Sequence, residues 1–196
     1  MATQKESDLQ QEADRAVRIM REGGIILYPT DTVWGLGCDA TNAEAVAKIF
    51  ALKQRADNKS MIILLDEADS VPRYVRQVPD VAWELWEVSD KPLTLILPEG
   101  VGLAPNLLPQ EKSVAIRLVG NDFCRRLIHK LRRPLVSTSA NISGEPSPLT
   151  FEQISEPIKA GVDYVVGPAM EQADATHSPS SIIRLGLGGQ IEIIRK

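Results

Sequence analysis

A short apolar run that breaks directly into hydroxyl-bearing residues, at 134–148, constrains the fold more than any other stretch. Residues 134–136 (PLV) predict a buried strand, and the following STSANISGEPSP predicts an irregular loop at its exit. Two further hydroxyl-rich strand exits are expected at 29–32 (PTDT) and 178–181 (SPSS). Because ligands of open α/β sheets bind where strands end, the three stretches are candidates for one binding site, with solvated Ser-rich loops as the alternative interpretation.

The bulk properties fit one globular domain. At 196 residues the chain is long enough for a single domain with its own core, which we expect at 8–196 with 1–7 as a flexible extension. Hydrophobic residues make up 43% and charged residues 24%, which excludes a disordered or coiled-coil protein. The net charge of −4 argues against a protein that coats nucleic acid, so any such contact needs a local basic patch.

Targeting segments and metal motifs are missing from the sequence pattern. The apolar runs are too short to span a bilayer, and the first residues lack the features of a signal peptide, so we expect a cytoplasmic protein without a membrane partner. Cys38 and Cys124 form no CxxC motif and are expected to be reduced. His129 and His177 stand apart from one another, so no structural zinc site is expected.

Apolar residues at helical spacing predict helices around a sheet. A capping box at Ser7 opens the first helix, and a second one at Thr41 opens a helix whose apolar stripe also contains Lys53. Asn121 or Asp122 caps a basic helix, and two prolines divide 66–89 into two short helices. A further helix is capped at Thr150.

Continuous or alternating apolar runs predict the strands. In 113–119 the alternation directs Val114, Ile116 and Leu118 inward and leaves Arg117 on the other face. Because helices and strands alternate early while strand-only stretches follow, the fold class is α/β with a mixed rather than a purely parallel sheet. Strands are expected at 24–28, 60–65, 92–97, 113–119, 134–136 and 162–166, with a terminal hairpin of 181–185 and 190–194.

Cations in unusual places indicate an anion-binding site. Lys53, Arg55 and Lys59 are either a solvated charge cluster or directed at an anion, and the apolar position of Lys53 favours the second. Arg117 lies mid-strand, where its planar fork suits a carboxylate or phosphate. The sequence has no GxxxxGK[ST], no GxGxxG after a strand and no GxSxG. Serines without a base favour binding through hydroxyls over nucleophilic attack.

Five motifs in order carry a family resemblance. They are PTDTVWGLGCDA (29–40), LKQR (52–55), AIRL (115–118), STSANISGEPSP (137–148) and SPSSII (178–183). Together they resemble the YrdC-like threonylcarbamoyl-AMP synthases over nearly the whole chain. The family hallmark, KxR followed by SxN, is present as Lys53/Arg55 and Ser139/Asn141.

The resemblance implies a nucleotidyltransferase that makes L-threonylcarbamoyl-adenylate and pyrophosphate from L-threonine, bicarbonate and ATP, with Mg²⁺ accompanying the ATP. It implies a twisted mixed parallel/antiparallel sheet with flanking helices and a concave basic cleft, in the short single-domain form of the family. The product would serve N6-threonylcarbamoyladenosine modification of tRNA and pass to a separate threonylcarbamoyl transferase complex.

The resemblance also implies roles for individual residues. Lys53 and Arg55 would be the catalytic cations beside the phosphates. The L-threonine pocket would use Thr32, Arg117, Ser137 and Ser180. The ATP side would use Arg55, Lys59, Ser113, Ser139, Asn141, Ser147 and Arg195.

Two other functions stay open from the sequence. A paralogue that binds double-stranded RNA or tRNA at the same basic cleft would show salt-sensitive RNA affinity without ATP consumption. Carbamoyl transfer to another acceptor is the second, since YrdC-like domains also occur in hydrogenase-maturation carbamoyltransferases. The acylphosphatase and zinc-finger segments of those proteins are not seen in this sequence, which weighs against it.

Overall fold

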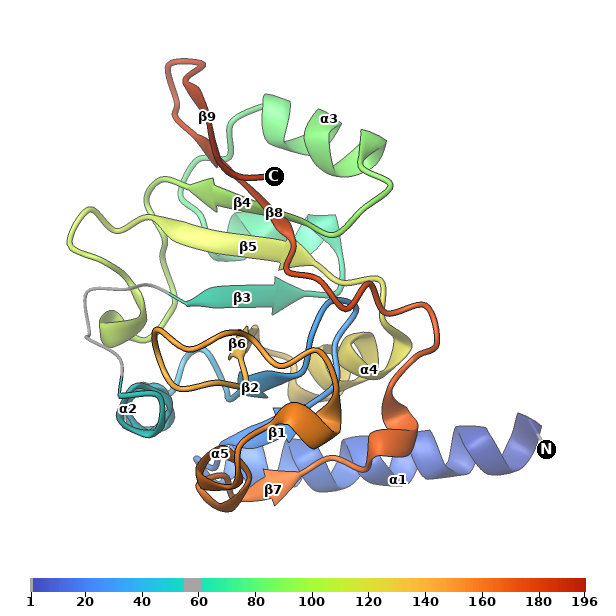
Figure 1. The fold of residues 1–196 in the computed structure, drawn as a ribbon. Coiled ribbons are helices and arrows are strands. Elements are labelled where there is room, and N and C mark those ends of the chain that lie inside the picture. The colour runs from blue at the N-terminus through green and yellow to red at the C-terminus, as the bar shows by residue number, and fades with distance from the viewer. Residues whose placement is uncertain (1, 55–60) are drawn as a thin grey trace.

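A single mixed sheet runs through the molecule (Figure 1). The computed structural model describes residues 2–54 and 61–196, and within them the strands adjoin in the order β7-β1-β2-β6-β3-β5-β4-β8-β9. The pairs β1/β7, β3/β5 and β4/β8 are parallel and the remaining pairs are antiparallel, which confirms the mixed sheet. The strands are β1 (Ile26–Tyr28), β2 (Gly35–Gly37), β3 (Ile62–Leu65), β4 (Leu93–Leu97), β5 (Val114–Leu118), β6 (Leu135–Ser139), β7 (Tyr164–Val165), β8 (Ser181–Leu185) and β9 (Ile191–Arg195).

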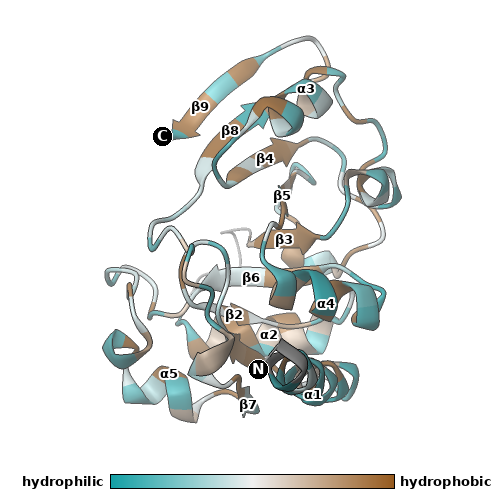
Figure 2. Ribbon diagram, turned by 90° about the vertical axis from the view of Figure 1, so that its right-hand side faces the viewer, coloured by the Kyte–Doolittle hydropathy of each residue, from teal (hydrophilic) through white to brown (hydrophobic). Residues whose placement is uncertain are grey.

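Helices lie on both faces of this sheet. In Figure 2 the strands β2, β3 and β4 are mostly apolar, whereas α1 and α4 are largely hydrophilic on the sides that face solvent. The α-helices are α1 (Ala2–Arg21), α2 (Ala43–Leu52), α3 (Val81–Val88), α4 (Asp122–Leu131) and α5 (Glu156–Ala160). Short 3₁₀ helices complete the set: η1 (Ala68–Arg73), η2 (Pro105–Leu107), η3 (Phe151–Gln153) and η4 (Pro168–Met170).

The first face of the sheet is largely apolar. Leu27, Ile63, Leu95 and Ile116 are buried there in one core that also contains the apolar sides of α2 and α3. Period-2 alternation accounts for this face, because Ile63 and Leu95 are both cross-strand partners of Ile116. The predicted inward direction of Val114 and Ile116 is confirmed.

The second face is only half covered by helices. Leu64 and Leu135, which are cross-strand partners, pack beneath α1 and α4 in a second core. Beyond Leu64 the same row across the strands becomes polar. It continues through Arg117, Thr94, Ile182 and Arg195, which are successive partners on β5, β4, β8 and β9. The uncovered half of this face therefore presents side chains to a possible ligand.

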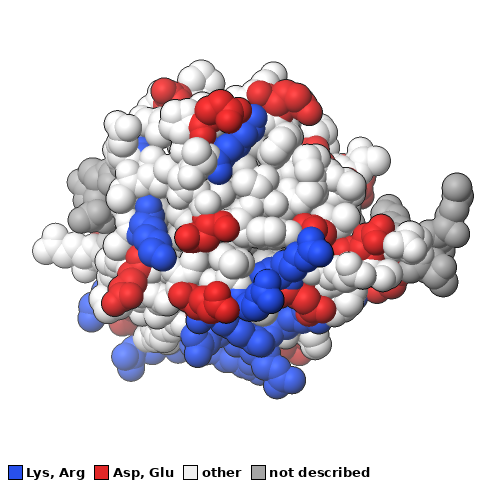
Figure 3. Space-filling model, turned by 90° about the horizontal axis from the view of Figure 1, so that it is seen from below, with Lys and Arg blue, Asp and Glu red and all other residues white. Residues whose placement is uncertain are grey.

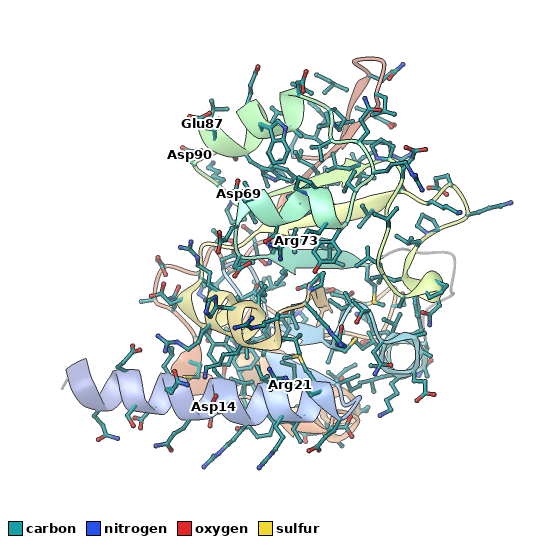
Figure 4. All side chains as sticks on the ribbon, turned by 180° about the vertical axis from the view of Figure 1, so that it is seen from behind. Asp14, Arg21, Asp69, Arg73, Glu87 and Asp90 are labelled. Atoms are coloured by element: carbon teal, nitrogen blue, oxygen red, sulfur yellow. The ribbon has the colours of Figure 1, made fainter. Side chains whose placement is uncertain are left out.

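Helix α1 is fixed to α4 by charged contacts. The Lys130 ammonium lies 2.6 Å from the Asp14 carboxylate, and Arg21 donates a hydrogen bond of 2.6 Å to the Lys130 carbonyl. This hydrogen-bonded pair holds the pKa of the exposed Asp14 below its ordinary value. Figure 4 shows Asp14 and Arg21 projecting from α1 when the molecule is seen from behind.

The helix starts differ from two of the predicted caps. Helix α1 begins at Ala2, so the capping box at Ser7 is wrong and residues 2–7, predicted as a flexible extension, are helical. Helix α2 is capped by Asn42 in place of Thr41: the Asn42 side chain accepts from the amides of Glu44 and Ala45, while the Thr41 hydroxyl donates to Asp39. The predicted cap of α4 is confirmed, since the Asn121 side chain accepts from the Cys124 amide.

Several other elements also differ from the prediction. Strand β6 continues through Ser139, so the predicted loop starts three residues later than expected. The residues SPSS lead into β8 instead of following a strand, and the glycine-rich β2 was not predicted. The helix expected after Thr150 is divided into η3 and α5. The apolar strands, the two short helices of 66–89 and the terminal hairpin are confirmed.

Candidate functional site

A cavity of about 220 Å³ lies on the uncovered half of the second sheet face. Strands β5, β6, β8 and β9 contribute to its wall, together with the turn between β1 and β2 and the segment before β8. Further lining residues include Gly35, Met61, Ile62 and Thr138. The predicted site residues that it brings together are Thr32, Arg117, Ser137, Ser139, Ser147, Ser180 and Arg195.

Arg117 is the most deeply placed cation of this cavity. Its residue is 3% exposed, and its Nη2 donates to the Asp31 carboxylate at 2.8 Å. Its Nε is buried without a hydrogen-bond partner among the described residues. A buried ion pair of this kind fixes the plane of the guanidinium, so that the remaining donors are presented in one direction.

Arg195 approaches the same cavity from the edge strand β9. Its Nε donates to the Ser180 carbonyl at 2.8 Å. Partial burial, and then the positive charge of Arg117, lower the pKa of Arg195 below its ordinary value. The positive charges of the two arginines repel each other, and an anion bound between them offsets this repulsion.

Hydroxyl groups occupy the wall between the two arginines. The Ser180 hydroxyl lies 2.8 Å from that of Thr94, which is fully buried on β4 beside Arg117. Ser137 and Ser139 point to the cavity from alternate positions of β6, where the strand is pale in Figure 2 because hydroxyls interrupt its apolar run. Such groups can donate to, or accept from, a polar ligand without reacting with it.

Lys53 ties the end of α2 to the segment that follows β6. It is 1% exposed, and its ammonium donates to the carbonyls of Ser139 and Asn141 at 2.5 and 2.6 Å. The Lys53 carbonyl in turn accepts from the Ser143 amide at 2.8 Å. This lysine of the apolar stripe is therefore buried, and it holds the backbone that carries both residues of the SxN motif.

Asn141 stabilises the backbone conformation of the same segment. Its Nδ2 donates to the carbonyls of Ile142 and Glu145 at 2.9 and 2.7 Å, while its Oδ1 is buried without a described partner. Asn141 is 9% exposed and is not among the residues that line the cavity. The amide thus closes the turn after β6, and the orphaned Oδ1 is its unused acceptor.

Two predicted ATP-binding residues, Ser113 and Asn141, lie outside the lining of this cavity. The Ser113 hydroxyl donates to Glu111 at 3.2 Å, and Ser113 lies outside the lining. Arg55 and Lys59 lie outside the described residues. Among the described residues, the cations that line the cavity are Arg117 and Arg195, and the concave basic cleft stays a prediction.

Comparison with known proteins identifies the family. The Sua5/YciO/YrdC family model, described as telomere recombination, matches residues 18–196. The chain belongs to this family. Threonylcarbamoyl-AMP synthase of Pseudomonas aeruginosa (strain UCBPP-PA14) is 35% identical over 160 residues, covering 81% of this chain and 85% of the relative. The enzyme of the same name from Pseudoalteromonas translucida is 31% identical over 170 residues, covering 85% and 89%.

Solved structures of the family share the fold. Sua5 of P. abyssi in complex with L-threonine has a TM-score of 0.81 at 28% identity, covering 90% of this chain and 51% of that one. The chain therefore spans about half the length of that protein. YciO of E. coli has a TM-score of 0.79 at 24% identity, covering 95% and 89%, and supports the fold alone.

Sequence reasoning missed two residues that hold predicted binding-site side chains in place. Asp31 pairs with Arg117, and Thr94 contacts Ser180. A signal existed for the first, because a mid-strand arginine needs an acid, but nothing in the sequence selects Asp31 over other carboxylates. Thr94 is an ordinary strand residue, and only the register of β4 against β5 places it beside Arg117.

The acidic residues of this family member form no metal centre in the described structure. The described residues contain no cluster of three His, Cys, Asp or Glu side chains that could hold a metal ion, and no carboxylate is among those that line the cavity. Among the described helices none is long and apolar enough to cross a membrane.

The two cysteines do not contribute reactive thiols. Cys38 and Cys124 are both fully buried, and burial raises the pKa of each thiol above its ordinary value. We expect neither to react with iodoacetamide in the native protein, because the thiolate is the reactive form. Mass spectrometry should show both alkylated only after unfolding in denaturant. Labelling of either cysteine under native conditions would contradict this placement.

Proposed function

We propose that this cavity makes L-threonylcarbamoyl-adenylate and pyrophosphate from L-threonine, bicarbonate and ATP. The observation that carries the proposal is the cross-strand row from Arg117 through Thr94 and Ile182 to Arg195. It places two cations at opposite sides of a hydroxyl-lined cavity without a lining carboxylate in the described residues. The curated relatives named threonylcarbamoyl-AMP synthase supply the reaction that such an anion site serves.

We propose two substrate regions within this lining. Arg117 would bind the carboxylate of L-threonine through its bidentate fork, with Thr32, Ser137 and Ser180 around the amino acid. Ser139, Ser147 and Arg195 would lie on the ATP side, where Asn141 shapes the backbone, and Ser113, Arg55 and Lys59 remain predicted contacts. The cavity volume of about 220 Å³ suits the amino acid and the reacting phosphate. Because pockets for whole drug-sized ligands have roughly 300 Å³ or more, the adenosine would extend out of the cavity.

The reaction needs positioning more than acid–base chemistry. The threonine amine attacks the carbon of bicarbonate, water is lost, and a carbamate results. A carbamate oxygen then attacks the α-phosphorus of ATP, and pyrophosphate leaves. Fixed positive charge near the phosphates stabilises the charge that develops in the second step. The described lining offers arginines and hydroxyls for this work, without histidine or carboxylate.

Lys53 would act on the ATP side through the segment that it holds. Its ammonium is committed to the carbonyls of Ser139 and Asn141, which fixes the Ser139 backbone at the cavity edge. Arg55 is the residue of the pair that we propose to contact phosphate directly. Mg²⁺ enters with the nucleotide as part of the substrate.

The wider role in tRNA modification is also a proposal. The product would pass to a separate transferase complex in the cytoplasm, and a direct tRNA contact would use the basic residues near the cavity. Helices α1 and α4 suit tRNA less, because Arg126 and Lys130 pair with Glu6 and Asp14. Figure 3 shows Lys and Arg along one edge of the underside with Asp and Glu between them. Charges of both signs do not make the uniform basic patch that phosphates need.

Pyrophosphate release is the test of this function. We expect release only when L-threonine, bicarbonate and ATP with Mg²⁺ are all present, because adenylation consumes the carbamate made from the first two. The measurement is an enzyme-coupled pyrophosphate assay in which each component is omitted in turn. Phosphate or pyrophosphate release with ATP alone would instead indicate an unrelated ATPase.

A further inference from the structure

Thr30 makes three hydrogen bonds directly behind Thr32. Both threonines are 2% exposed and lie in the turn between β1 and β2, but only Thr32 lines the cavity. The Thr30 hydroxyl donates to the Val33 carbonyl at 2.8 Å, and it accepts from the Thr32 amide at 3.0 Å. The two hydroxyl oxygens are 2.9 Å apart.

Counting protons fixes the direction of the contact between the hydroxyls. A threonine hydroxyl has one hydrogen and two lone pairs. The single hydrogen of Thr30 is used on the Val33 carbonyl, so the remaining contacts of Thr30 are accepted ones. Thr32 must therefore donate its own hydrogen to Thr30. Once it does so, the Thr32 oxygen has only lone pairs left for the cavity.

We propose that Thr30 is a positioning residue that makes Thr32 a hydrogen-bond acceptor for the α-amino group of L-threonine. This inference rests on the proposed function for the identity of the ligand. The described lining has no carboxylate that could bind an ammonium group, so an acceptor must come from a hydroxyl or a carbonyl. A fixed lone pair suits an N–H donor and disfavours a carboxylate, which directs the carboxylate to Arg117.

The hydroxyls on the other side of the cavity are arranged differently. Thr94 and Ser180 contact each other, and no described carbonyl accepts from either one. Thr94 does not line the cavity, so when Thr94 donates to Ser180 the hydrogen of Ser180 is available there to bind an oxyanion. The site thus has an acceptor at Thr32 and donors at Ser180 and Arg117, which matches the two ends of an amino acid.

The variant Thr30→Val tests the proposal. It removes the acceptor for the Thr32 hydrogen, so the Thr32 hydroxyl is free to turn and donate to the cavity. Isothermal titration calorimetry without ATP should show the Kd of L-threonine raised roughly tenfold or more, the effect of one hydrogen bond to a charged donor. Binding of β-hydroxybutyrate, which keeps the carboxylate and hydroxyl but lacks the amino group, should change little.

Matched variants separate positioning from a general structural effect. Thr30→Ser keeps the hydroxyl and should restore wild-type affinity. Thr41→Val removes a comparable hydroxyl contact, to Asp39 at the start of α2, and should leave the Kd unchanged. If valine prevents folding, Thr30→Ala removes the same hydrogen bonds in a smaller side chain. Adding Thr32→Val to Thr30→Val should cause little further loss, because Thr30 acts through Thr32.

The outcomes distinguish this inference from the proposed function. If the wild-type protein fails to bind L-threonine, the proposed function is wrong and the inference falls with it. If the wild-type protein binds L-threonine and Thr30→Val binds it equally well, the inference alone is wrong. An equal loss of affinity for L-threonine and β-hydroxybutyrate also overturns it, because the amino group would then not be the group that Thr32 accepts from.

Discussion

Replacing Arg117 by alanine is expected to raise the Kd of L-threonine roughly a hundredfold, because two charge-assisted hydrogen bonds to the carboxylate are lost. The same change leaves Asp31 without its cation at 15% side-chain exposure. Breaking a buried ion pair by removing one partner should lower the free energy of unfolding by about 3 kcal/mol. Calorimetry with L-threonine and urea unfolding measure the two effects separately.

Arg126→Ala is the matched control for this arginine. Arg126 also pairs with a carboxylate, that of Glu6 at 2.6 Å, but with side-chain exposures of 29% and 62%. Its loss should change the free energy of unfolding by about 1 kcal/mol or less and leave the Kd of L-threonine unchanged. Wild-type affinity for L-threonine in Arg117→Ala would mean that the amino acid binds elsewhere.

Lys53→Ala is expected to reduce pyrophosphate release by about a hundredfold or more while L-threonine still binds. The carbonyls of Ser139 and Asn141 lose their donor, so the segment after β6 no longer holds Ser139 in place. Because the threonine side depends on Arg117 instead, the affinity for L-threonine should persist. Steady-state kinetics for ATP and calorimetry for L-threonine check the two statements. Arg55→Ala should abolish release as well, through loss of a phosphate contact.

A second lysine of α2 provides the control. Lys48 also donates to a backbone carbonyl, that of Gly23 at 2.8 Å, but its side chain is 52% exposed and lies away from the cavity. Lys48→Ala should turn over like the wild-type enzyme. Equal turnover in Lys53→Ala and Lys48→Ala would show that the tie to Ser139 has no role in the reaction.

Most of the fold follows from local sequence patterns. The exceptions, β2 and β6, contain residues that are unusual in strands and pair with partners distant in the chain. Strand β3 consists of branched apolar residues, and in β5 Val114, Ile116 and Leu118 alternate with other residues, so propensity and period agree with their place in the sheet. Strand β2 was missed because two of its three residues are glycines, which are depleted in strands. A Cβ on Gly37 would lie 2.6 Å from the Tyr28 ring, so close packing of β1 against β2 requires glycine there.

The same limit applies to β6. Its last three residues carry hydroxyls and resemble a loop, yet Ser139 pairs with Gly35 and Ser137 with Ile62. Partners distant in the chain supply the hydrogen bonds that extend the strand. A local pattern cannot reveal such partners, which is why the loop was predicted too early.

The residue types of the site were easier to predict than their partners. The sequence indicated that Arg117 needs an anion, and Asp31 supplies one. The sequence also placed Lys53 on an apolar helix stripe, either at the core edge or directed at an anion, and the residue is buried. It did not indicate that the Lys53 ammonium would bind carbonyls, because those carbonyls come from a segment more than 80 residues away. Nor did it indicate the hydrogen-bond direction at Thr32, which depends on the position of the Val33 carbonyl.

A crystal structure with L-threonine and a non-hydrolysable ATP analogue tests the central claim most directly, namely that one cavity holds both substrates in a fixed order. The account predicts the threonine carboxylate on Arg117, its amino group on Thr32 and the α-phosphate near Ser139. L-threonine bound outside this cavity, or a triphosphate lying on Arg117 in place of the carboxylate, would contradict it.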